Sequence, residues 1–215
     1  GQYTRNECYF DNNPEMKASG LPNKEVKSIL LKLREKHGAS FVPKTTLTKP
    51  VGAPGQGQSL DNNIKIANAL LDSAGWKVEA DGIRSKNGKR MVIKLVLSSP
   101  LFQRIIEPYK NNLKKIGLSL DVKVVQIAKY EEILRNFNFD MVVANYPQSR
   151  SPGNEQRSMW SSEAESTAGS RNYMGIKNPA IDELIDRIVE AKSRKELINS
   201  IQAMDRILTH QFYIV

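Results

Sequence analysis

The chain has 215 residues, of which 40% are hydrophobic and 26% are charged. This balance excludes an intrinsically disordered protein, because it provides enough apolar residues for a core. All apolar runs are shorter than the roughly 18 residues that a membrane-spanning helix needs. A single cysteine, Cys8, excludes an internal disulfide and a multi-cysteine metal site. The formal net charge of +9 at pH 7 makes a nucleic-acid partner one hypothesis to weigh.

Residues 1–60 are expected to form a helix followed by an irregular arm. Apolar residues recur at helical spacing after Pro22, and Gly38 ends the pattern. Repeated Pro and Gly over 39–60 predict irregular structure. The Gly-rich run at 52–59 lacks the Gly-Lys-Ser/Thr ending of a phosphate-binding loop, and no strand pattern precedes it. A flexible connection is therefore the better interpretation of this run.

From residue 61 onward, helical and strand patterns alternate, which is typical of an open α/β sheet. The last expected strand, 139–144, is continuously apolar, which favours a central position covered on both faces. Pro108 is expected to kink its helix. The expected elements are helices over 61–74, 99–116 and 130–135, strands over 91–97, 118–124 and 139–144, and a hairpin at Asn87-Gly88.

A long loop over 146–177 leads to a pair of helices. Asn178-Pro179 supplies the N-cap and the first residue of one helix. Ser193 with Glu196 forms a capping box for the other. We therefore expect the whole chain to form a single α/β lobe, with its core and the C-terminal helix pair in residues 61–215.

Residues that could catalyse a reaction or bind a metal are scarce. Neither His37 nor His210 has an Asp, Glu, Cys or His at a ligand spacing, and no nucleophile elbow or Ser-His pair is present. The sequence therefore predicts no enzyme, no metal site and no cofactor, with a hydrolase as a weak alternative. Lys and Arg are spread along helix faces and mixed with Glu, which favours solvated faces. A basic nucleic-acid-binding α/β domain is the alternative function, although no recognition module is present.

The most unusual segment is the loop at 149–157, which follows the presumed central strand. In open α/β sheets, ligands bind beyond the carboxyl ends of the strands. The loop carries two guanidinium groups, a carboxylate and two amides, which are groups that bind the carboxylate, amine and backbone of a peptide. A surface turn built around Pro152-Gly153 explains the composition equally well.

Two sequence motifs together provide a specific indication of a protein family. Residues 67–76 have the sequence Ala-Asn-Ala-Leu-Leu-Asp-Ser-Ala-Gly-Trp, and residues 151–157 have the sequence Ser-Pro-Gly-Asn-Glu-Gln-Arg. They resemble motifs of periplasmic oligopeptide-binding proteins, the substrate-binding subunits of peptide-type ABC importers. The loop motif, with Gly-Ser-x-Asn at 169–172, is similar to the branch that takes up short peptides and peptide-like antibiotics of the microcin C type. Further similar stretches lie at 9–10, 18–22, 112–117, 139–140, 169–175, 178–182 and 205–208.

The resemblance implies the second, C-terminal lobe of a two-lobed type II periplasmic binding protein, an α/β lobe with an open mixed sheet flanked by helices. It implies that the N-terminal lobe and the signal peptide of the parent protein are absent from this chain. The parent would capture oligopeptides or peptide-like compounds between its lobes and deliver them to ABC permease subunits in the inner membrane. Its partners would be that ligand, the permease and the missing lobe, with no nucleic acid. Because half of a clamp offers few contacts, we expect calorimetry to find weak or undetectable peptide binding by this chain alone.

The resemblance and the position after the last strand together predict a ligand-binding site. Two arginines would pair with ligand charges, Asn and Glu side chains would form hydrogen bonds, and aromatic rings would stack. An ion pair between Glu155 and Arg157 that rigidifies the loop is an equally weighted alternative. The candidate ligand-binding residues are Asn145, Tyr146, Arg150, Asn154, Glu155, Arg157, Trp160, Asn172 and Tyr173.

Overall fold

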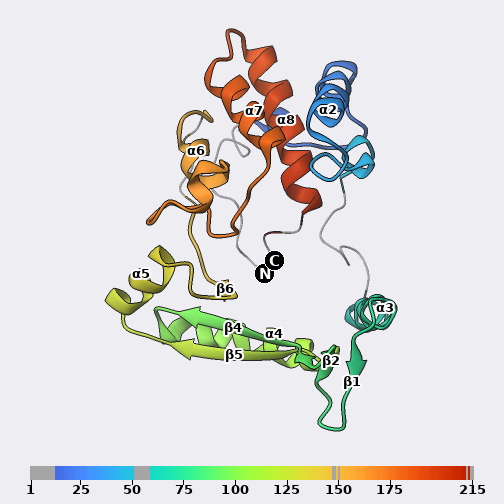
Figure 1. Cartoon of the computed structure of the whole chain (residues 1–215), viewed down its shortest axis with the longest axis vertical. Coiled ribbons are helices and arrows are strands. Elements are labelled where there is room, and N and C mark those ends of the chain that lie inside the picture. The colour runs from blue at the N-terminus through green and yellow to red at the C-terminus, as the bar shows by residue number, and fades with distance from the viewer. Residues whose placement is uncertain (1–12, 51–58, 147–148, 150, 212, 214–215) are drawn as a thin grey trace. The chain divides into compact units, whose positions relative to one another are not determined.

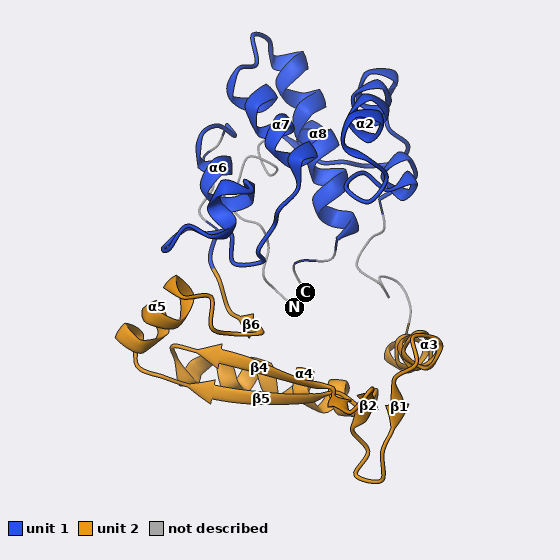
Figure 2. Cartoon of the chain, viewed as in Figure 1, with its two compact units in different colours: residues 1–51, 145–215 blue, residues 52–144 orange. Residues whose placement is uncertain are grey.

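A computed structural model describes residues 13–50, 59–146, 149, 151–211 and 213 of the chain. Its contacts divide the chain into two compact units (Figure 1, Figure 2). Unit 1 comprises residues 1–51 and 145–215, and unit 2 comprises residues 52–144. Within the described residues, each unit has a hydrophobic core of its own. The boundary near residue 51 falls in the segment predicted to be irregular.

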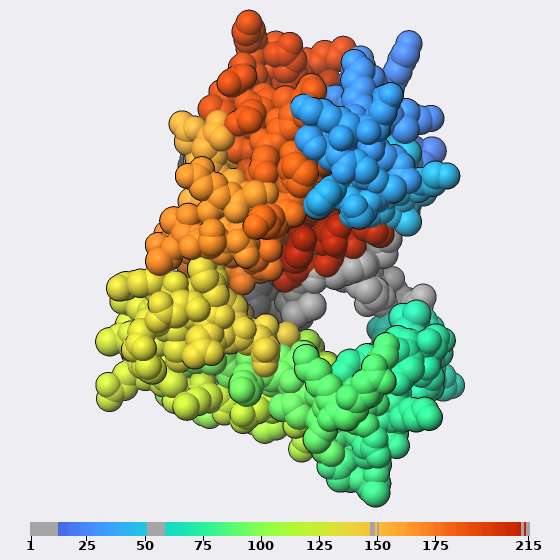
Figure 3. All heavy atoms as spheres, viewed as in Figure 1, coloured from blue at the N-terminus to red at the C-terminus, as the bar shows by residue number. Residues whose placement is uncertain are grey.

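Three long helices build unit 1, and each packs against the other two through an apolar stripe. In α8, for example, Ile201, Met204 and Ile207 are buried at helical spacing. The space-filling view shows α2 and α7 in contact on one face of the unit (Figure 3). The elements of unit 1 are the helices α2 (Lys24–His37), α6 (Glu155–Trp160), α7 (Pro179–Val189) and α8 (Arg194–His210), and the 3₁₀ turns η1 (Pro14–Met16), η2 (Lys44–Leu47) and η4 (Glu163–Glu165).

Side-chain caps fix where the long helices of unit 1 begin. The side chain of Asn178 accepts a hydrogen bond from Ala180 N, which confirms the predicted cap of α7. Ser193 Oγ likewise accepts from Glu196 N. The second bond of the predicted capping box differs, because Glu196 accepts from Lys192 N. Helix α2 begins at Lys24 and is capped by the preceding asparagine, two residues later than the prediction around Pro22.

Unit 2 contains two three-stranded sheets, one antiparallel and one parallel. The predicted hairpin at Asn87-Gly88 is confirmed, and the φ angles of these residues, 51° and 76°, have the positive sign that a type I′ turn requires. The elements of unit 2 are the strands β1 (Lys77–Val78), β2 (Arg84–Lys86), β3 (Lys89–Arg90), β4 (Val92–Leu97), β5 (Ser119–Val124) and β6 (Met141–Val142), the helices α3 (Leu60–Ser73), α4 (Gln103–Lys114) and α5 (Ile127–Arg135), and the 3₁₀ turn η3 (Pro100–Phe102).

The prediction that residues 139–144 form the central strand is wrong. The parallel sheet has the order β5-β4-β6, so β4 is central and β6 is a two-residue edge strand. Leu95 and Leu97 of β4 are buried under α4, whereas both residues of β6 remain partly exposed. An apolar run does not reveal whether a strand is central. The position of a strand depends on the side of β4 to which the preceding crossover connection brings the chain.

Helix α3 buries none of its residues within the described structure, although its apolar residues share one face. The helix forms as expected, and Gly75, with φ 82°, closes a Schellman motif in which Trp76 N donates to Leu71 O. Leu70 of the apolar face is 65% exposed. Pro108 lies inside helix α4. No helix in the described ranges is both long and apolar enough for a transmembrane span.

Candidate ligand-binding site

Three of the predicted site residues, Tyr146, Trp160 and Tyr173, form one aromatic cluster in unit 1. The rings of Tyr146 and Trp160 stack with centroids 5.4 Å apart and planes at 14°. Tyr173 meets Tyr146 edge-on at 5.8 Å and 63°. Burial, with a smaller contribution from Tyr173, raises the pKa of Tyr146. The Tyr146 hydroxyl is therefore neutral at physiological pH, and it donates to Met174 Sδ at 2.9 Å.

Trp160 is held by a helix that the sequence analysis missed. Residues 155–160, predicted as loop, form α6, because Met159 and Trp160 provide buried apolar side chains at its C-terminal end. Trp160 Nε1 donates to the Oε1 of buried Gln156 one turn earlier, at 2.8 Å. This bond fixes the indole that carries the stack. The spacing of Gln156 and Trp160 is the sequence signal that could have revealed it.

Glu155 organises the loop before α6. Its Oε1 accepts hydrogen bonds from Ser149 Oγ at 2.8 Å and from the backbone N of Gly153 at 3.2 Å. The alternative of a Glu155–Arg157 ion pair is wrong, because Arg157 Nη1 lies 2.8 Å from Asp186 Oδ1 of α7. Arg157 thus fastens α6 to α7, and in this structure both side chains are engaged with the protein.

Asn172 holds the segment between η4 and α7 in place through side-chain hydrogen bonds. Its side chain is fully buried, and its Nδ2 donates to Ser161 O at 3.0 Å and Ile176 O at 2.8 Å. Its Oδ1 accepts from Ile176 N at 2.8 Å. All three of these side-chain hydrogen bonds join Asn172 to backbone groups. We therefore regard Asn172 as a residue that positions its neighbour Tyr173.

The remaining candidates are dispersed. Asn145 and Asn154 are exposed, and Asn154 precedes α6 without capping it through its side chain. Arg150 lies outside the described residues. The structure therefore brings the aromatic residues together and leaves the two amides at the surface.

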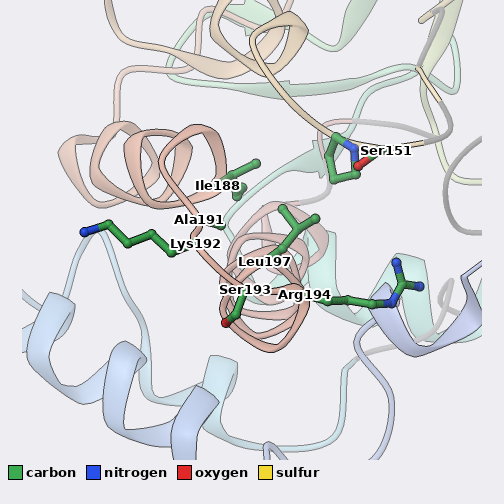
Figure 4. A pocket seen from close by; sticks show the side chains of 8 residues that line it. Ser151, Ile188, Ala191, Lys192, Ser193, Arg194 and Leu197 are labelled. Atoms are coloured by element: carbon green, nitrogen blue, oxygen red, sulfur yellow. The ribbon is translucent and has the colours of Figure 1, made fainter.

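A separate hollow of about 340 Å³ lies between the loop that carries Ser151 and the turn from α7 to α8 (Figure 4). None of the predicted site residues lines it. Of the two cations that line it, Lys192 and Arg194, the second is ion-paired with Glu15 at 2.5 Å. We therefore place the candidate site at the aromatic cluster. The residues lining the hollow are Ser151, Pro152, Ile188, Ala191, Lys192, Ser193, Arg194 and Leu197.

Both histidines contact side chains of unit 1. His37 Nε2 lies 3.0 Å from Glu183 Oε2, and the His210 ring lies 3.0 Å from Thr45 Oγ1. Across the part of the chain that the structure describes, no group of three or more His, Cys, Asp or Glu side chains could hold a metal ion.

Comparison with known proteins identifies the family. Residues 19–168 match the model of bacterial extracellular solute-binding proteins, family 5, middle region. The chain therefore belongs to this family of solute-binding proteins. The match covers the parallel sheet of unit 2 together with Tyr146 and Trp160, and it ends before Tyr173.

Individual relatives are consistent with this assignment. The chain is 36% identical to the uncharacterised protein y4wM of Sinorhizobium fredii, in an alignment that covers all of this chain and 32% of y4wM. It is 31% identical to the probable peptide-binding protein YejA of Agrobacterium fabrum, in an alignment that covers all of this chain and 34% of that protein. The chain thus spans about a third of the length of these curated relatives.

The fold is also that of part of a known binding protein. The oligopeptide-binding protein AppA of Bacillus subtilis, solved with a nonapeptide, matches 90% of this chain and 42% of its own with a TM-score of 0.63 and 20% identity. This likeness confirms the predicted α/β fold class of a type II binding-protein lobe. The alternative of a nucleic-acid-binding domain receives no support from these matches.

Proposed function

We propose that this chain is the second, C-terminal lobe of a longer periplasmic binding protein that captures oligopeptides or peptide-like compounds. The parent delivers its ligand to ABC permease subunits in the inner membrane, and it is not an enzyme. The observation that carries the proposal is the aromatic cluster, which begins four residues after the parallel strand β6 ends. Membership in the solute-binding family and the printed name of the Agrobacterium relative support it.

In this proposal the partly exposed rings of Tyr146 and Tyr173 bind apolar side chains and peptide planes of the ligand, and buried Trp160 supports them. Aromatic rings suit a broad peptide binder, because they supply contact area at low conformational cost. Exposed Asn145 and Asn154 form hydrogen bonds to the ligand backbone, and Arg150 is a charge partner. Glu155, Arg157 and Asn172 hold the loop and thereby the rings. Short peptides and peptide-like antibiotics of the microcin C type are the proposed ligands, on the strength of the loop motif.

The test uses the parent protein that carries this lobe. Trialanine binding is measured by calorimetry for the wild type, Tyr173→Ala and Tyr173→Phe. We expect Tyr173→Ala to weaken binding about tenfold, because an aromatic contact is lost, and Tyr173→Phe to bind nearly as the wild type does. Mass spectrometry of ligand co-purified with the protein identifies the natural peptide.

Two outcomes would contradict this function. Unchanged affinity in Tyr173→Ala would remove the aromatic cluster from the site. Absence of peptide binding together with salt-dependent binding of DNA or RNA would favour the nucleic-acid alternative instead.

A further inference from the structure

One arginine of unit 1 differs from the others. Among the described arginines of this unit, Arg171 alone has a guanidinium with no ion pair and no hydrogen bond to the protein. Its neighbour Arg157 pairs with Asp186. The remaining arginines and their acceptors are Arg34 with Val42 O, Arg187 with Glu183, Arg194 with Glu15, and Arg206 with the carbonyls of Ser19, Gly20 and Thr48.

The backbone on both sides of Arg171 is firmly held. Arg171 N donates to Ser158 O at 2.9 Å, which ties it to α6. Before it, Ser170 Oγ donates to Ala164 O at 2.5 Å. After it come buried Asn172 and then Tyr173 of the aromatic cluster. The residue is therefore presented from a rigid segment directly beside the candidate site.

Within the described residues, Arg171 is unpaired although an acidic residue precedes it by six positions in the sequence. Glu165, a carboxylate of the same segment, is also partly buried, yet no ion pair joins the two in the described structure. Arg171 itself is only partly exposed. A guanidinium offers five donors, and a partly desolvated one gains strongly from a carboxylate that binds two of them at once.

Resting on the proposed function, we propose that Arg171 binds a carboxylate of the peptide ligand beside the aromatic cluster. It makes the site selective for peptides with a free carboxylate over amidated peptides of the same sequence. The sequence analysis missed this residue, because the Gly-Ser-x-Asn motif leaves its position variable. The sequence signal that could have indicated Arg171 is its position close to the candidate arginines Arg150 and Arg157.

The experiment titrates the ¹⁵N-labelled 215-residue chain with trialanine and with trialanine amide, and follows backbone amides by NMR. One lobe is expected to bind only with millimolar affinity, which this method detects. We expect the acid to shift the amides of Ser158, Arg171 and Tyr173 with an affinity about tenfold tighter than that of the amide. In Arg171→Gln this preference disappears, and in Arg171→Lys it is partly retained.

Arg187→Gln is the matched control, because it removes a guanidinium already paired with Glu183 and so keeps the preference. If both peptides shift the cluster equally in the wild type, the role of Arg171 is refuted while the proposed function stands. If neither peptide shifts residues of the cluster at about 20 mM, well above the affinity expected when only one lobe supplies contacts, the proposed site fails as a whole. A preference that survives in Arg171→Gln also overturns the proposal.

Discussion

Glu183 of α7 receives three cationic neighbours, two from the end of α2 and one from its own helix. Lys36 Nζ and His37 Nε2 lie 2.9 Å and 3.0 Å from its Oε2, and Arg187 Nη2 lies 2.8 Å from its Oε1. The hydrogen bond from Lys36 contributes most, followed by those from Arg187 and His37. Together they lower the pKa of Glu183 to about 2 against the opposing effect of burial. The carboxylate thus links α2 to α7.

A lowered carboxyl pKa stabilises the folded state above the unfolded pKa, and that stability is lost as the pH falls through the folded pKa. We expect Glu183→Gln to cost on the order of 1 kcal/mol at pH 7, because the lost ion pairs are partly solvated. The difference in the free energy of unfolding between the variant and the wild type narrows below pH 4.5 and approaches zero near pH 2. Urea denaturation at pH 7, 4.5 and 3 measures it, and a cost independent of pH would contradict the electrostatic account.

At the residue scale, local signals were predictable and distant partners were not. Asn178 and Ser193 cap their helices through backbone groups two and three residues away, so the sequence shows both members of each interaction. Arg157 instead pairs with Asp186 on another helix, and Asn172 bonds to the backbone of Ser161. A carboxamide or guanidinium in a loop has no sequence pattern that distinguishes a ligand contact from such an internal one.

Elements of unit 2 are joined by one buried arginine. Arg84 of β2 is 2% exposed and donates to Asp72 Oδ1 of α3 at 2.6 Å and to Asn68 Oδ1 at 2.9 Å. Its Nε donates to Ile116 O, just after α4, at 2.9 Å. Helix α3 buries no residue of its own, and these bonds attach it to the hairpin together with the bond from Lys86 Nζ to Ala74 O. The side chain fits because Gly117 leaves room for it.

This fit predicts different costs for two glycines with similar backbone conformations. Gly117 has φ 77°, and a Cβ there would lie 2.6 Å from Arg84 Cγ. Gly82 has φ 81° and nothing within 4 Å of its Cβ position. We expect Gly82→Ala to cost about 1 kcal/mol from backbone strain alone, and Gly117→Ala about 3 kcal/mol, since it also displaces Arg84. Equal shifts of the urea midpoint would show that the Arg84 contact does not matter.

At the element scale, long amphipathic segments were predictable, whereas short elements and their neighbours were not. Strands β4 and β5 and helices α7 and α8 follow their apolar periodicity. The six residues of α6 are too few for a periodic signal. The place of β6 at the sheet edge depends on chain crossovers, which leave no mark on the strand itself.

For the whole molecule, family membership was predictable because motifs along nearly the entire chain occur in the same order. The net charge of +9 was a weaker guide, since cations on solvated helix faces contribute as much as those in a binding site. The division into two units, with unit 1 assembled from both ends of the chain, was not apparent from periodicity. Periodicity reports which face of an element is buried, but not which distant element buries it.

The separate cores imply that the two units differ in stability. In the described residues, seventeen buried side chains form the core cluster of unit 1 and three form that of unit 2, so unit 1 gains more from apolar burial. Hydrogen exchange is therefore expected to be at least tenfold slower in α7 and α8 than in β4 and β5. Leu184→Ala, a cavity costing about 2–5 kcal/mol, should lower protection in unit 1 and leave β4 unchanged. Leu95→Ala should do the reverse, whereas a loss of protection in both units from either substitution would show that they unfold as one cooperative body.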